Sequence, residues 1–154
     1  MLTATYKLLP AAVGISDAAT KQAILEALAD RFAAAYDLDR LAVLDGLEER
    51  EGLGSTGFGR GIAIPHARIE GVNRPVAALL QLENPVDFKS ADGMPVDLVF
   101  GLISPANAGI SHLHALAAIS RLVRDDQVRE ALVDAPDAEA IIALLTNVTD
   151  RDVA

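Results

Sequence analysis

The chain contains no cysteine and no tryptophan. Without cysteine there is no disulfide, no thiolate metal site and no thiol nucleophile, and a chain of this kind suits the reducing cytoplasm, where we expect the protein to be found. Aromatic residues make up only 4% of the chain, so the core must consist of Ala, Leu, Ile and Val. Such a core suits helices packed against a sheet, which favours an α/β fold.

Positive charge and long apolar runs are also scarce. Thirteen Lys and Arg face 22 Asp and Glu, a net charge of −9, which disfavours nucleic acid and anionic membrane surfaces as partners. No run of about 18 apolar residues occurs, and the N-terminus lacks the basic start of a signal peptide, so we expect no membrane insertion. With 154 residues, 51% of them hydrophobic, we expect one domain spanning 1–154.

Apolar spacing predicts helices in both halves of the chain. Residues 17–36 have helical spacing with Ser16 as N-cap, and residues 39–51 predict a second helix that ends at Gly52. The C-terminal part predicts three more helices, at 112–124, 126–134 and 137–146.

Between these groups the pattern changes to loop and strand. Residues 52–61 contain five glycines in ten positions, which predicts loop or turn rather than helix. Next, Pro65 favours extended backbone before it, so we expect a short edge strand that delivers His66 at its end. The apolar runs 76–82 and 96–104 predict strands in the interior of the sheet.

Three histidines are the candidates for chemistry, because neutral imidazole is the nucleophile or proton carrier that remains. His66 lies just after the glycine-rich segment and outside any helical stripe. His112 and His114 are two residues apart in a predicted helix, so they point roughly 200° apart. The apolar register places His112 inward and His114 toward solvent, which makes His112 the candidate companion of His66.

The position of His112 permits two interpretations. It lies in the first turn of its predicted helix, where free N–H groups and the helix dipole favour an anion and disfavour imidazolium. A phosphate would fit there. The alternative is a partly buried histidine that is hydrogen-bonded to backbone.

Arginine is enriched around His66. The segment 60–74 holds three Arg and one acid, a net charge of +2 in an acidic chain. Arg50 precedes the glycine-rich segment and can present a bidentate fork to phosphate oxygens. A surface ion pair of Arg50 with Glu49 or Glu51 is an equally good interpretation.

Nucleotide and metal sites have little support. The glycine pattern of 57–61 is neither the dinucleotide fingerprint nor a phosphate-binding loop ending in Lys-Ser/Thr. A zinc site would need His66 and His112 with Asp92 or Asp97, and no short-spaced ligand pair anchors it. We therefore expect neither a cofactor nor a metal.

Residues 54–66, GSTGFGRGIAIPH, resemble the phosphorylation-site signature of the fructose/mannitol/nitrogen class of phosphotransferase-system enzyme IIA. The resemblance extends over nearly the whole chain, through residues 21–32, 47–51, 92–100 and 112–116. It implies an α/β fold with a small mixed β-sheet flanked by helices, a phosphotransferase/anion-transport-like sandwich. One departure is Ala67-Arg68 after the histidine, where many members have glycine.

The resemblance also implies roles for individual residues. His66 would be the phosphorylated residue, reacting through Nε2, with Arg50 and His112 supporting the phosphoryl oxygens. The hydroxyls of Ser55 and Thr56 match the hydroxyl pair beside the loop. We assign these two residues, together with Arg68, to phosphate binding.

By the same resemblance, the phosphoryl group would come from an HPr-like carrier, which an apolar rim such as Phe58 and Ile62 would dock. The sequence of residues 61–66 is more similar to that of the nitrogen-regulatory type, whose targets would be sensor kinases, potassium-transport proteins or similar. Two alternatives stay open. One is a sugar-specific enzyme IIA that passes phosphate to a IIB domain, and the other is a regulatory binding module that accepts no phosphate.

Overall fold

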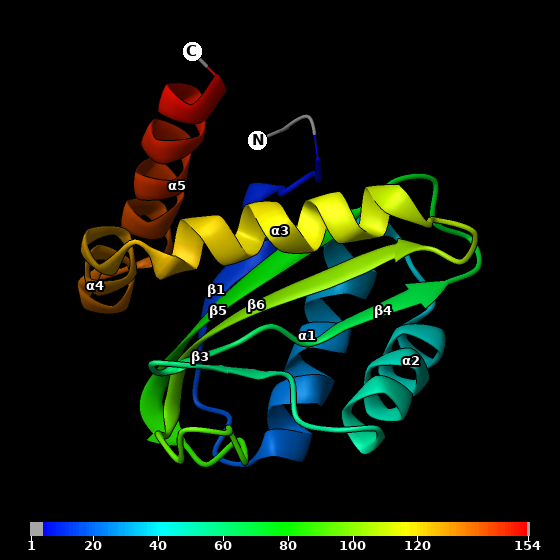
Figure 1. Cartoon of the computed structure of the whole chain (residues 1–154), viewed down its shortest axis with the longest axis horizontal. Helices are drawn as coiled ribbons and strands as arrows, with labels where there is room; N and C mark the ends of the chain where they lie inside the picture. Colours follow the sequence, from blue (N-terminus) through cyan, green and yellow to red (C-terminus); the bar gives the residue numbers. More distant parts are fainter. Residues whose placement is uncertain (1–4, 154) are drawn as a thin grey trace.

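A mixed six-stranded sheet organises the chain (Figure 1). The computed structural model describes residues 5–153, and the side chains of residues 5–147. Its strands are β1 (Val13–Ser16), β2 (Gly57–Gly59), β3 (Ile62–Ala63), β4 (His66–Ile69), β5 (Val76–Val86) and β6 (Val96–Pro105). Its helices are the 3-10 turn η1 (Pro10–Ala12) and α1 (Lys21–Tyr36), α2 (Arg40–Gly52), α3 (Ile110–Arg124), α4 (Asp126–Asp134) and α5 (Ala138–Val153).

The strands run in the order β1-β5-β6-β3-β2, and β4 also pairs with β6. β3 and β4 are both parallel to β6 and lie one after the other along the same edge of it. Pro65 lies between them, and its carbonyl accepts from Leu102 N at 2.9 Å. Proline has no N–H to donate, so the strand is interrupted there. As a result, His66 is the first residue of β4.

This arrangement corrects the edge strand expected before His66. β3 ends at Ala63 and lies between β6 and β2. The glycine-rich segment is also more regular than expected, because β2 lies within it and forms a hairpin with β3. Gly59, Arg60 and Gly61 connect the two strands with φ values of 104°, 60° and 86°. Glycine tolerates this left-handed backbone where most residues are strained.

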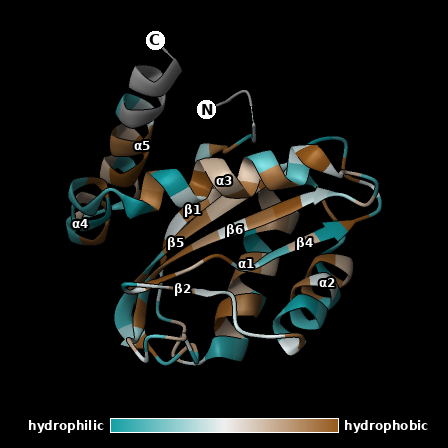
Figure 2. Cartoon of the chain, in the orientation of Figure 1, coloured by the Kyte–Doolittle hydropathy of each residue, from teal (hydrophilic) through white to brown (hydrophobic). Residues whose placement is uncertain are grey.

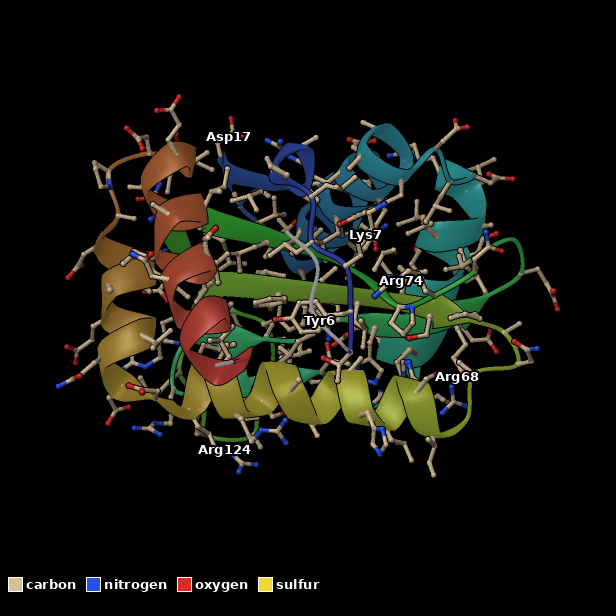
Figure 3. All side chains as sticks on the ribbon, turned by 90° about the horizontal axis from the view of Figure 1, so that it is seen from above. Tyr6, Lys7, Asp17, Arg68, Arg74 and Arg124 are labelled. Carbon is tan, nitrogen blue, oxygen red and sulfur yellow. The ribbon has the colours of Figure 1, made fainter. Side chains whose placement is uncertain are left out.

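Helices cover both faces of the sheet. Figure 3 shows the sheet nearly edge-on, with α1 and α2 on one side and α3 on the other. Helix α1 packs on β5, α2 on β4 and α3 on β6. Figure 2 shows hydrophobic residues along β5 and β6, and both strands are largely buried, as the apolar runs predict. The expected α/β fold with a small mixed sheet flanked by helices is confirmed.

The helix boundaries agree best for α2 and α4. Asp39 accepts from Leu41 N, so α2 begins within one residue of the prediction, and α4 has its predicted bounds. The start of α1 was predicted four residues too early. Thr20 is its N-cap, accepting from Ala23 N, whereas Ser16 ends the unpredicted strand β1. Helix α3 begins at Ile110, two residues before its predicted start, and α5 continues to Val153, beyond its predicted end at residue 146.

Candidate active site

A cavity of about 390 Å³ lies where α2, β4 and the first turn of α3 meet. It contains four of the six predicted site residues: Arg50, His66, Arg68 and His112. Its other lining residues are Gly46, Glu49, Leu53 and Ala67. Residues from three separate segments of the chain are thus brought together around two histidines.

His66 is half-buried, and a hydrogen bond within its own segment orients it. Its Nδ1 lies 2.7 Å from the carbonyl oxygen of Ile64. A carbonyl only accepts, so Nδ1 carries the proton and donates, which leaves Nε2 with a free lone pair. Burial, followed by the charges of Arg50 and Arg68, lowers the pKa of His66, although the Ile64 bond and Glu51 act the other way. The ring is therefore neutral at neutral pH.

His112 lies opposite, with its ring centroid 5.6 Å from that of His66. It is 4% exposed, and its Nδ1 lies 2.7 Å from the hydroxyl of the buried Ser104. Burial, and then the charges of Arg68 and His66, lowers the pKa of His112 to about 4. The inward orientation predicted for His112 is confirmed, and so is the exposure of His114.

Arg50 reaches the cavity because α2 approaches β4 closely. Gly46 lies one turn before Arg50, and a Cβ at Gly46 would meet Ala67 Cβ and Ile69 Cγ2 at 3.1 Å each. Arg50 Nη1 donates to the carbonyl of Gly54 at 2.8 Å, which uses one of its five donors. Glu51, one of the two acids considered as its ion-pair partner, pairs instead with Lys21 at 2.9 Å.

Arg68 lies two residues after His66 in β4, so both side chains project from the same face of the strand. Figure 3 shows Arg68 near the N-terminal end of α3, whereas Arg124 lies at the other end of that helix. Its charge lowers the pKa of both histidines. Arg68 is therefore the cation that acts on both rings.

Ser55 and Thr56 do not line the cavity. Ser55 Oγ donates to the carbonyl of Phe88 at 2.7 Å, and the Thr56 hydroxyl donates to Glu51. Thr56 is itself buried. In this arrangement their hydroxyls hold the glycine-rich segment in place, and contact with a phosphate in the cavity would require both to rearrange.

Sequence reasoning missed several residues of the cavity wall. Gly46 and Glu49 lie on the same face of α2 as the predicted Arg50, and Leu53, the C-cap of α2, follows Arg50 by three residues. That spacing is itself a signal, because residues three and four apart are neighbours on a helix. Together with Arg50, it could have identified the whole lining face of α2.

The described residues form neither a metal-binding cluster nor a membrane-spanning helix. Within residues 5–147, no three His, Asp or Glu side chains come close enough to hold a metal ion. In that part of the chain Asp92 accepts from Arg60 N and Met94 N. No helix described in residues 5–153 is long and apolar enough to cross a membrane.

Comparison with known proteins identifies the family of the chain. The family model "Phosphoenolpyruvate-dependent sugar phosphotransferase system, EIIA 2" matches residues 11–148. The chain belongs to this enzyme IIA family. The nitrogen regulatory protein of Pseudomonas aeruginosa is 42% identical over 130 residues, which cover 84% of each chain. A protein of Haloferax volcanii named the fructose-specific EIIA component is 38% identical over 133 residues, 86% of each chain.

Solved structures support the same assignment. The nitrogen regulatory protein IIA-Ntr of Neisseria meningitidis superimposes with a TM-score of 0.82 at 34% identity, covering 90% of this chain and 95% of that one. The matched family is described as part of a phosphoenolpyruvate-dependent sugar phosphotransferase system. A phosphotransferase role for this enzyme IIA follows at that level.

Proposed function

We propose that this enzyme IIA accepts a phosphoryl group on Nε2 of His66 from an HPr-like phosphocarrier, and that it acts as a nitrogen-type regulator. The observation that carries the proposal is the 2.7 Å bond between His66 Nδ1 and the Ile64 carbonyl. It fixes the tautomer in which Nε2 is unprotonated. The lowered pKa keeps that nitrogen nucleophilic at neutral pH.

The transfer requires no proton to leave His66. The Nε2 lone pair forms a bond to phosphorus while the P–N bond of the carrier's phosphohistidine breaks and returns its electron pair to the carrier's imidazole. The product is a phosphoramidate whose ring, bonded to phosphorus at Nε2 and still donating through Nδ1–H to Ile64, is an imidazolium. The carrier's phosphorylated ring begins in the same protonated form, so it leaves as a neutral imidazole and the charges balance. With a loose phosphoryl transition state, the protein's part is positioning and neutralisation of oxygen charge.

The groups that line the cavity supply that neutralisation. Arg50 retains four donors beyond the one given to Gly54. Helix α3 begins nearby with Gly109 as an N-cap that makes no side-chain cap bond, which leaves first-turn N–H groups for an anion. We assign Arg50, Arg68 and His112 to the phosphoryl oxygens, whereas Ser55 and Thr56 keep the loop that surrounds them in place.

The carrier would dock on apolar side chains around the cavity mouth. Leu53 lines the cavity and is 82% exposed, and Ile110 and Leu113 flank His112 at 70% and 56% exposed. The docking role expected for Ile62 is wrong, because that side chain is fully buried in β3. Phe58 is half-buried under Arg124, whose guanidinium carbon lies 6.0 Å from the ring centroid.

Radiolabelling tests the proposal. The chain is incubated with labelled phosphoenolpyruvate, enzyme I and an HPr-type carrier. We expect the wild type and the matched control His114→Ala to take up one label that is stable to base and labile to acid. His66→Ala should take up none, and label that persists in that variant would contradict the proposal.

The regulatory part of the proposal rests on the relatives named nitrogen regulatory protein, and we propose sensor kinases or potassium-transport proteins as targets. Affinity for such a target should differ between the phosphorylated and unphosphorylated chain, measured by calorimetry with each form. Equal affinities would contradict regulation through His66.

A sugar-specific role is the second candidate, because the Haloferax volcanii relative named fructose-specific is 38% identical. It predicts that label on His66 passes to the cysteine of a cognate IIB domain. The third possibility, a binding module that accepts no phosphate, predicts that the intact chain stays unlabelled with its cognate carrier. The same labelling gel distinguishes all three outcomes.

A further inference from the structure

Glu51 is a buried carboxylate that the reaction itself does not use. It follows Arg50 in the last turn of α2 and is 8% exposed. Burial of a charge costs free energy unless the charge is paired and hydrogen-bonded. Glu51 meets both conditions: Oε1 accepts from Thr56 N at 2.7 Å and lies 2.9 Å from Lys21 Nζ, and Oε2 accepts from the Thr56 hydroxyl.

A chain of hydrogen bonds leads from this carboxylate to the imidazole. The carbonyl of Thr56 accepts from Ile64 N at 2.9 Å. The carbonyl of the same Ile64 accepts from His66 Nδ1 at 2.7 Å. Glu51 therefore holds the backbone of Thr56, Thr56 holds the backbone of Ile64, and Ile64 holds the ring of His66, so the series acts by fixing the position of each residue in turn.

Other contacts anchor the same turn. Arg50 donates to the carbonyl of Gly54, so neighbouring residues of α2 hold both ends of the turn before β2. Ser55 donates to the carbonyl of Phe88, and Lys21 lies 4.9 Å above the Phe88 ring. The Lys21–Glu51 pair thus connects the first turn of α1 to the glycine-rich segment.

We propose that Glu51 is a positioning residue for phosphoryl transfer, which acts through Thr56 and Ile64 to hold His66 in the tautomer with Nε2 free. Its effect on the transfer rate rests on the proposed function. Its effect on the tautomer does not, because the unphosphorylated chain reports the tautomer directly.

Two substitutions separate the hydrogen bonds from the charge. Glu51→Ala removes every contact of the carboxylate. The amide of Glu51→Gln keeps an oxygen for Thr56 N–H and an NH₂ for the Thr56 hydroxyl, and loses only the charge that faces Lys21. Thr56→Val and Thr56→Ser form a second pair, in which only serine retains the hydroxyl. Glu48→Gln, on an exposed side chain of the same helix, is the matched control.

Two readouts report on positioning rather than on stability. Proton–nitrogen correlation spectra of the histidine ring show the tautomer of His66 in each variant. The rate of phosphoryl transfer from the labelled carrier, measured over a range of carrier concentrations, gives kcat and KM. It is measured at a temperature where circular dichroism shows that every variant compared is folded.

We expect Glu51→Ala to give a mixture of His66 tautomers and to lower kcat about 100-fold, with KM within about threefold, because misplacement by about 1 Å costs this much. Glu51→Gln and Glu48→Gln should stay within about threefold of wild type in kcat. If Glu51→Ala does not fold, Thr56→Val should show the same defect to a lesser degree. Thr56→Ser, which retains the hydroxyl, should have the wild-type tautomer and a kcat close to that of the wild type.

A folded Glu51→Ala, or a folded Thr56→Val, with the wild-type tautomer and the wild-type kcat would overturn the proposal. A wild type that is never labelled, but whose tautomer changes in Glu51→Ala, would instead remove the proposed function and keep the positioning role.

Discussion

The two sides of the cavity hold their histidines differently. On the side of α2 and β4, His66 is half-buried and donates to the Ile64 carbonyl. On the side of α3, His112 is almost fully buried, and its partner is the Ser104 hydroxyl. A carbonyl permits one role for the ring nitrogen, whereas a hydroxyl can donate or accept. One ring is therefore fixed in a single tautomer, and the other is free to change.

This difference fits the two tasks that the proposed function gives to the rings. A nucleophile must present the same lone pair in every turnover, so a fixed tautomer suits His66. A residue that meets an anion gains from the freedom to present N–H, so the hydroxyl partner suits His112. The predictions below test one side against the other.

The largest effect is expected on the α2 side. Arg50→Gln should lower the transfer rate about 100-fold, because loss of one donor to developing oxygen charge costs this much. Arg50→Lys should recover part of the rate, since it restores charge but not the fork. Single-turnover transfer from labelled carrier measures both. The control is Arg121→Gln, on the exposed face of α3, and an equal loss in that variant would mean that bulk charge is responsible.

The next effect belongs to the α3 side and concerns stability in acid. The folded-state pKa of His112 is about 4, below the unfolded value of 6.5, so the unfolded chain binds more protons between these values. Stability present above pH 6.5 is therefore lost as pH falls toward 4. Between pH 7 and 5 the loss from this group is about 2 kcal/mol.

Urea unfolding of wild type, His112→Gln and the exposed control His114→Gln at pH 7 and 5 measures this loss. The difference between the two pH values should shrink in His112→Gln and stay as in wild type in His114→Gln. A His112→Gln variant that keeps the full wild-type dependence would show that His112 is not buried in its neutral form.

The smallest effects are expected for substitutions at two glycines of α2, which differ in the space around them. Gly46→Ala adds a methyl at 3.1 Å from Ala67 and Ile69, and should destabilise by about 1 kcal/mol, since overpacking outweighs the gain in helix propensity. It should also slow transfer several-fold by shifting Arg50. Gly52→Ala has no neighbour within 4 Å of its added Cβ and should leave the rate unchanged.

Thermal unfolding and the transfer assay measure the two variants side by side. A Gly46→Ala variant as fast as Gly52→Ala would mean that the close approach of α2 to β4 does not position Arg50.

Local signals explain what the sequence could predict. Asp39 caps α2, and the register of α3 separates His112 from His114, because capping and helical periodicity depend on residues a few positions apart. The strands β1 and β4 have four residues each and were not predicted. Strands this short are defined by partners far along the chain, in β5 and β6.

The site follows the same rule. His66 and Arg50 stand out by residue type and by the family resemblance, but the contacts that orient them do not. The Glu51–Thr56 bonds and the Ser104–His112 bond appear only after folding brings these segments together. The sequence therefore predicted phosphate binding for Ser55 and Thr56, whereas in the structure their hydroxyls hold the loop.

The central claim is that phosphate enters on Nε2 of His66, and nitrogen spectra of the phosphorylated chain test it most directly. Phosphoryl transfer from labelled carrier to a chain carrying ¹⁵N-histidine should give phosphorus–nitrogen coupling at Nε2 of His66, with Nδ1–H retained. Coupling at Nδ1 of His66, or at either nitrogen of His112, would contradict the account.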